Sequence, residues 1–130
     1  MVIIDKLQDL LVVSLGSILG TCTRFLMFIK LEKILLKKGY SILTINTFAS
    51  FCLGFFLSFI TDTNAFKLLD KLVLFFVIGF LGSLSSFSTF VYDLFDLWSK
   101  NEFASASKLL IISLFLGISS LALGYFLGNK

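Results

Sequence analysis

The sequence predicts an all-α integral membrane protein with four transmembrane helices, and three observations lead to this prediction. Of the 130 residues, 58% are hydrophobic and only 15% are charged, and the mean hydropathy is +1.02. A soluble domain has about 45–50% apolar residues and about a quarter charged ones. The charged residues gather in short clusters, and four long apolar segments lie between them.

Each apolar segment is long enough to cross a bilayer, since a hydrocarbon core of about 30 Å takes about 20 helical residues. The predicted spans cover residues 10–29, 42–60, 72–94 and 109–127. The connections are short, and Trp98 lies at a helix end, where interfacial rings are favoured. We expect one transmembrane domain over residues 1–130, with both termini on the same side. We also expect the first span to be a retained helix rather than a signal peptide.

The first, second and fourth spans carry small or polar residues at helical spacing, which places each set on one face. The sets are Gly16, Gly20 and Arg24; Asn46, Ser50 and Gly54; and Ser113, Gly117, Ser120 and Gly124. Close helix packing explains the glycines, because small residues let membrane helices approach one another. It does not explain Arg24 or Asn46, which are costly in hydrocarbon without partners and therefore indicate a functional site.

The third span is unusual because the segment Gly79–Phe90 lies at membrane depth, within a charge-free run from Leu72 to Tyr92. This segment contains two glycines and five hydroxyl residues where a spanning helix ordinarily has Leu and Val. Such a composition favours either close packing or a polar lining. Irregular backbone at that depth is tolerated only where protein or water satisfies its polar groups.

Several chemistries are excluded by the residue types. Histidine is absent and the acidic residues lie near span ends, which removes the usual parts of a proton-coupled transporter, a metal site or an acid–base enzyme. Cys22 and Cys52 lie within apolar segments, where packing residues are more common than disulfides. The net charge of +3 follows no basic stripe, so nucleic acid is not an expected partner. We therefore expect no enzyme activity.

Neutral hydrogen-bond donors and one cation remain at membrane depth, namely the Asn46 amide, several hydroxyls and Arg24. Donors without an opposing carboxylate suit an anion, because they replace its hydration without trapping it. Phe87 and Phe90 flank two hydroxyl residues, and the positive edge of an aromatic ring can also face an anion. These residues predict a narrow anion pathway.

The lysines are distributed almost evenly between the two sides of the membrane. The side of the termini has four: Lys6, Lys67, Lys71 and Lys130. The other side has six: Lys30, Lys33, Lys37, Lys38, Lys100 and Lys108. Lysine and arginine excess normally fixes orientation, so this weak bias allows either a single orientation or insertion both ways up.

Three motifs resemble the CrcB/Fluc family of fluoride channels. The stretch G-S-L-S-S-F-S-T-F over Gly82–Phe90 resembles the family's third-helix signature G-x-x-T-T-F-S-T-F, with Ser85 and Ser86 in place of the threonine pair. Thr44-Ile45-Asn46 followed by Gly54 resembles its second-helix pattern V-N-x-x-G-x-F-x-x-G. Gly16, Gly20 and Arg24 resemble its first-helix pattern G-x-x-G-A-x-x-R. In this order the motifs cover essentially the whole chain.

The resemblance implies a third helix broken near its middle and an antiparallel, dual-topology homodimer with two fluoride pores. The implied pore residues are Asn46, Phe87, Phe90, Thr89 and Ser113. The resemblance also implies a structural sodium ion (Na+) at the dimer centre, required for activity and bound by the backbone carbonyls of Gly82 and Ser85. Arg24 is expected to be a vestibule cation or a structural cation, with Asp93 as a candidate partner. Gly117 stands where a second pore hydroxyl is expected after Ser113.

By the same resemblance, the chain is expected to be a fluoride channel of the plasma membrane (the bacterial inner membrane). Through it, cytoplasmic fluoride would leave the cell passively, which reduces fluoride toxicity.

Two alternatives to a fluoride channel stay open. A small dual-topology multidrug exporter has the same number of spans, but it needs a membrane-embedded carboxylate where this chain has Arg24. A non-transporting membrane subunit would produce no ion flux when purified.

Overall fold

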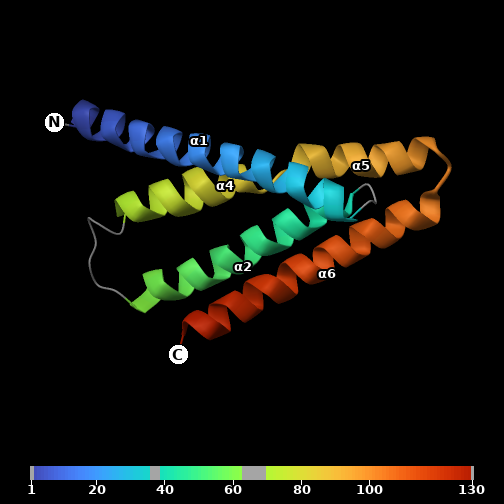
Figure 1. Ribbon diagram of the computed structural model, residues 1–130. Coiled ribbons are helices and arrows are strands. Elements are labelled where there is room, and N and C mark those ends of the chain that lie inside the picture. Colours follow the sequence, from blue (N-terminus) through green and yellow to red (C-terminus); the bar gives the residue numbers. More distant parts are fainter. Residues whose placement is uncertain (1, 36–38, 63–69, 130) are drawn as a thin grey trace.

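The computed structural model describes residues 2–35, 39–62 and 70–129, and the regular elements in these ranges are all helical (Figure 1). They are α1 (Val2–Leu35), α2 (Tyr40–Asp62), the π-helix η1 (Val73–Leu81), α4 (Gly82–Leu84), α5 (Phe87–Ser99) and α6 (Phe103–Gly128). The described part of the chain contains four segments long and apolar enough to span a membrane: Ile3–Leu35, Tyr40–Ile60, Asp70–Ser99 and Phe103–Gly128. Each predicted span lies within one of these segments, so the all-α, four-span prediction is confirmed.

The helices pack mainly in two pairs. α2 lies along α6, and α1 lies along η1 and α4, while α5 continues the third span beyond its interruption (Figure 1). The ends marked N and C lie at the same end of the bundle, and the connection from α5 to α6 lies at the other end (Figure 1). The third span therefore crosses the bundle in two pieces that meet near its middle.

Glycines allow the close approach within both pairs. A Cβ atom on Gly16 would collide with the carbonyl oxygen of Phe75 in η1. A Cβ atom on Gly54 would likewise collide with the carbonyl oxygen of Leu121 in α6. Gly117 differs, because its Cβ would meet only Ser50 Oγ at 3.8 Å, an ordinary contact. Close packing thus explains Gly16 and Gly54 but not Gly117.

Two residues with positive φ form the described turns at one end of the bundle. Gly39 has a φ of +84° immediately before α2, and Asn101 has a φ of 60° between α5 and α6. Both residue types adopt this left-handed conformation more readily than others. Across the second turn, the rings of Trp98 and Phe103 form a T-shaped pair, with ring centroids 4.8 Å apart. This aromatic pair fits the interfacial position expected for Trp98.

The hydrophobic core surrounds the interruption of the third span. Its buried members come from α2, η1, α4, α5 and α6: Ile42, Leu43, Ile45, Ala49, Leu81, Leu84, Phe90 and Leu109. Many other large apolar side chains are exposed on the outside of the single chain. The outer surface therefore suits a hydrocarbon environment, and the tightest packing fixes the region where the helix is broken.

Candidate functional site

The third span is broken at two consecutive serines. Ser85 has φ −71° and ψ 149°, and Ser86 has φ −137° and ψ 106°, so both are extended between α4 and α5. The last helical bond before the break runs from the Ser85 amide to the Leu81 carbonyl, at 3.2 Å. The break that the family resemblance implied is therefore present, and it exposes backbone groups that hydrocarbon cannot satisfy.

Asn46 of α2 satisfies both backbone groups of Ser86. The Ser86 amide donates to Asn46 Oδ1 at 2.9 Å, and Asn46 Nδ2 donates to the Ser86 carbonyl at 3.3 Å. This amide–backbone pair replaces the helical partners that Ser86 lacks. A side-chain amide has two N–H donors, so one donor of Asn46 remains for another acceptor. Asn46, a residue that is costly in hydrocarbon, therefore has a definite partner in the backbone of Ser86.

Arg24 of α1 reaches the same break from the other side. Its Nη1 donates to the Ser85 carbonyl oxygen at 3.5 Å, a long hydrogen bond, and it forms no ion pair with Asp93. The hypothesis that Asp93 is its partner is therefore not supported. Arg24 also lines a cavity of about 480 Å³ between α1, α2 and α5, together with Thr21, Cys22, Phe25, Phe28, Ile42 and Thr89. None of these lining residues is acidic.

The carbonyl of Gly82 has lost its helical partner at the break. In an α-helix this oxygen would accept the amide of Ser86, but that amide donates to Asn46 instead. From the described residues, the Gly82 oxygen instead accepts a long bond from Ser85 Oγ, at 3.4 Å. Gly82 is exposed, and its Cβ position is uncrowded. The last carbonyls of α4 thus form a negative helix end, which suits a hard cation.

Ser86 begins α5 as its N-cap. Its Oγ accepts the amide of Thr89 at 3.3 Å and lies 2.8 Å from Thr89 Oγ1. Its side chain is only 3% exposed, whereas Thr89 is half-buried and lines the cavity beside Arg24. The positive N-terminal end of α5 and a guanidinium therefore lie near one cavity, and both attract anions.

The two phenylalanines of the motif have opposite surroundings. Phe87, the first residue of α5, is 79% exposed, and Phe90 is 8% exposed within the hydrophobic core. Neither ring lines the cavity beside Arg24. In the single chain, Phe87 therefore projects outward, and Phe90 anchors α5 to the core.

Ser113 is the predicted pore residue that the break does not include. It lies half-buried on α6, and it neither lines the cavity nor forms a hydrogen bond with the residues of the break. Its predicted pore role remains a prediction that rests on the resemblance.

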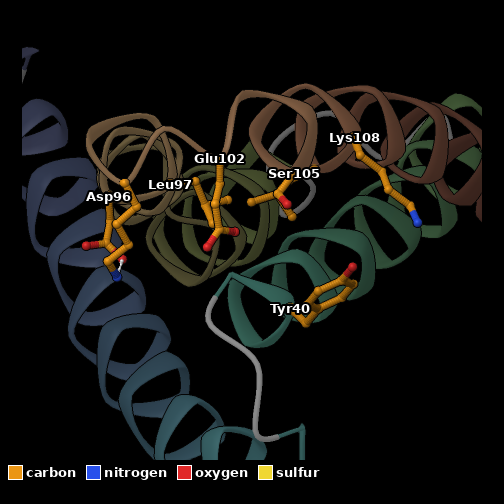
Figure 2. A pocket seen from close by; sticks show the side chains of 8 residues that line it. Tyr40, Asp96, Leu97, Glu102, Ser105 and Lys108 are labelled. Carbon is orange, nitrogen blue, oxygen red and sulfur yellow. Dashed lines mark hydrogen bonds and ion pairs between the residues drawn. The ribbon is translucent and has the colours of Figure 1, made fainter.

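A second cavity, of about 440 Å³, lies at the charged end of the bundle (Figure 2). It is lined by Tyr40, Asp96, Leu97, Lys100, Glu102, Ser105, Lys108 and Leu109. Asp96 and Lys100 form an ion pair at 2.7 Å, which the dashed line marks in Figure 2. The two cavities share no lining residue, and acids and bases are mixed here. This second cavity is therefore a polar feature of the span ends rather than part of the break.

Two features of the site were missed from the sequence. The role of Ser86 could have been found, because a serine before an apolar helical segment is a typical N-cap. The π-helix η1 carried no such signal, although π turns often occur near functional sites. At its end, the Gly82 amide points to the carbonyls of Gly79 and Val77. Only the three residues of α4 separate this π-helix from the break.

Comparisons with known proteins give a consistent result. Residues 11–125 match the family described as "CrcB-like protein, Camphor Resistance (CrcB)". The chain is 53% identical to "Fluoride-specific ion channel FluC 2" of Prochlorococcus marinus (strain NATL2A), covering 95% of this chain and 100% of the relative. It is 33% identical to "Fluoride-specific ion channel FluC 1" of Parasynechococcus marenigrum (strain WH8102), covering 92% and 93%. It is also 30% identical to a protein of Saccharophagus degradans named "Fluoride-specific ion channel FluC", covering 92% and 89%.

Proposed function

Because the chain belongs to the CrcB family, we propose that it is a fluoride-specific ion channel that lets cytoplasmic fluoride leave the cell passively. This exit would reduce fluoride toxicity. The family is one of ion channels rather than enzymes, and with its four spans the chain is a multi-pass protein of the plasma membrane. The resemblance noted in the sequence is thereby confirmed at the level of the family.

One observation in the molecule supports an anion most directly. Arg24 and Thr89 line a cavity without an acidic residue, beside the positive N-terminus of α5. Fluoride holds its hydration shell strongly, so a pathway must offer dense hydrogen-bond donors at narrow width. The free N–H of Asn46 and the Thr89 hydroxyl are such donors. Larger halides would be excluded by size.

The exposed ring of Phe87 supports a pathway completed by a second copy of the chain. At 79% exposure this ring lies outside the core of its own chain. We propose an antiparallel homodimer in which Phe87, Phe90 and Ser113 contribute to two pores shared by the copies. The weak lysine bias supports such a pair, because it permits insertion both ways up.

The residues at the break fit the structural sodium ion (Na+) that the family resemblance implies. The Gly82 carbonyl belongs to α4, and the Ser85 carbonyl to the extended break that follows it, where it also accepts the long bond from Arg24. Carbonyl oxygens have two lone pairs and are suitable ligands for a hard cation. Among the described residues there is no cluster of His, Cys, Asp or Glu that would favour a different metal. A bound sodium ion would neutralise these carbonyl dipoles and hold the break in place.

The test is ion efflux from liposomes that contain the purified protein. We expect rapid passive fluoride efflux, no chloride efflux, and loss of fluoride efflux when sodium is replaced by a large organic cation. Protein-free liposomes are the control. Equal fluoride and chloride rates, or no fluoride efflux in sodium, would contradict the proposal. If fluoride efflux is the same in sodium and in the organic cation, only the proposed structural sodium ion is contradicted.

A further inference from the structure

Within the described part of the chain, the Ser86 hydroxyl forms hydrogen bonds with one residue, Thr89, in two ways. Ser86 Oγ accepts the Thr89 amide at 3.3 Å, and the two hydroxyl oxygens lie 2.8 Å apart. Either oxygen could donate in the second contact by distance alone. The direction matters, because it decides whether the Thr89 proton remains available to a ligand.

Burial decides the direction of this hydrogen bond. Ser86 is 3% exposed, and Thr89 Oγ1 is the acceptor within reach of its hydroxyl proton. If Thr89 donated instead, the Ser86 proton would be buried without an acceptor, which is costly. Thr89 lines the cavity, so its own proton can be satisfied there. Ser86 therefore donates to Thr89, and the Thr89 proton turns toward the cavity.

Other membrane-depth hydroxyls show why this proton is unusual. Ser14, Thr23, Thr44 and Thr47 each donate to the carbonyl four residues earlier in the same helix. For Thr89 that carbonyl belongs to Ser85, which is extended and lies outside α5. The Ser85 oxygen accepts Arg24 instead. Because of the break, the Thr89 hydroxyl does not form the bond to the carbonyl four residues earlier that these other hydroxyls form.

We propose that Ser86 is a positioning residue, which orients the Thr89 hydroxyl as a hydrogen-bond donor to an anion in the cavity beside Arg24. This inference rests on the proposed function, since it assumes that fluoride passes this cavity. The Thr89 amide, the Ser86 hydroxyl and the Thr89 hydroxyl form a short chain of hydrogen bonds that polarise one another. The terminal donor is therefore stronger than an isolated hydroxyl.

The experiment compares Ser86→Ala, Ser86→Gly and Ser86→Thr in the full-length protein, by fluoride efflux and by melting temperature. Glycine is nearly as good an N-cap as serine, whereas alanine is a poor one. We expect both Ala and Gly to lower efflux about tenfold, the effect of losing a hydrogen bond to a charged group. Only the alanine variant should also lower the melting temperature. Threonine keeps the hydroxyl and should retain most of the efflux. Ser14→Ala is the matched control, because Ser14 bonds only within its own helix.

A second measurement tests whether Ser86 acts through Thr89. In a Thr89→Val background, Ser86→Ala should cause no further loss of efflux, because the hydroxyl that it orients is already absent. Efflux of the glycine variant near that of the natural protein would mean that Ser86 only caps α5, and additive losses would mean that it acts by another route. Either result overturns the inference. Absence of fluoride efflux from the natural protein would instead refute the proposed function itself, and this inference with it.

Discussion

Phe87 and Phe90 lie one turn apart on α5, yet their surroundings differ completely. Phe87 is 79% exposed at the first position of the helix, and Phe90 is 8% exposed among core residues. From the sequence motif, both are expected to be pore residues. The structure separates them into a ring that supports the chain's own packing and a ring that the chain leaves uncovered.

Alanine substitutions should therefore separate stability from flux. Phe90→Ala should cost about 3–5 kcal/mol of folding stability, as expected for a large ring removed from a core. Phe87→Ala should change the stability of the single chain by less than about 0.5 kcal/mol, typical of an exposed site, but should strongly reduce fluoride efflux. Melting temperature and liposome efflux measure the two effects.

Phe95 provides the matched control, because it is 66% exposed on the same helix but outside the motif. Phe95→Ala should leave both stability and efflux nearly unchanged. If Phe87→Ala conducts fluoride as well as Phe95→Ala does, the Phe87 ring has no part in the pathway.

At the scale of the elements, two glycine contacts hold the helix pairs together. Gly16 of α1 faces Gly79 of η1, where the Gly79 Cα would lie 3.2 Å from a Cβ on Gly16. Gly54 of α2 and Gly124 of α6 serve the other pair, since a Cβ on either would collide with a carbonyl oxygen of the opposite helix. Membrane helices approach this closely only where side chains are absent.

Gly54→Ala should destabilise the protein by about 1–3 kcal/mol, because the added methyl group overpacks the contact between α2 and α6. Gly117→Ala is the control, since its methyl group would make only an ordinary contact with Ser50. Alanine is a better helix former than glycine by about 1 kcal/mol, so this control should be neutral or slightly stabilising. Thermal unfolding in detergent measures both. Equal losses for the two variants would show that the α2–α6 contact does not depend on Gly54.

At the scale of the whole molecule, the two marked termini lie at the same end of the bundle (Figure 1). By sequence, this side has four lysines and the opposite side has six. The difference is small for a rule in which lysine and arginine excess sets orientation. This near balance permits the proposed dual topology, which the family resemblance implies.

A cysteine placed at Asn129 in a Cys22→Ala, Cys52→Ala chain should react with a membrane-impermeant maleimide on intact cells to about half of its final extent, because the weak bias allows both orientations. Adding lysines through Asn101→Lys and Ser105→Lys should hold the opposite side in the cytoplasm. Labelling should then approach completion. Labelling that is all or none in the chain without added lysines would contradict dual topology.

The sequence predicts the spans and the polar residues at the site better than it predicts their partners. Hydropathy locates all four spans, and cost in hydrocarbon singles out Arg24 and Asn46, which converge on the break. The partners depend on backbone groups that only a broken helix exposes. Asp93 is therefore only a candidate partner of Arg24 by sequence, and in the structure Arg24 donates to the Ser85 carbonyl.

The released carbonyl of Gly82 also has a consequence for symmetry. Gly82 stands as far along the sequence from Lys71 as from Asp93, the charged residues that bound the charge-free part of the third span. It therefore lies near the midplane of the bilayer. A two-fold axis that relates antiparallel copies must lie in that plane, so only groups near mid-depth can meet their own counterparts across it. In the proposed pair, Gly82 is placed to face Gly82, whereas Arg24, which is closer to one membrane surface, would be duplicated in opposite leaflets.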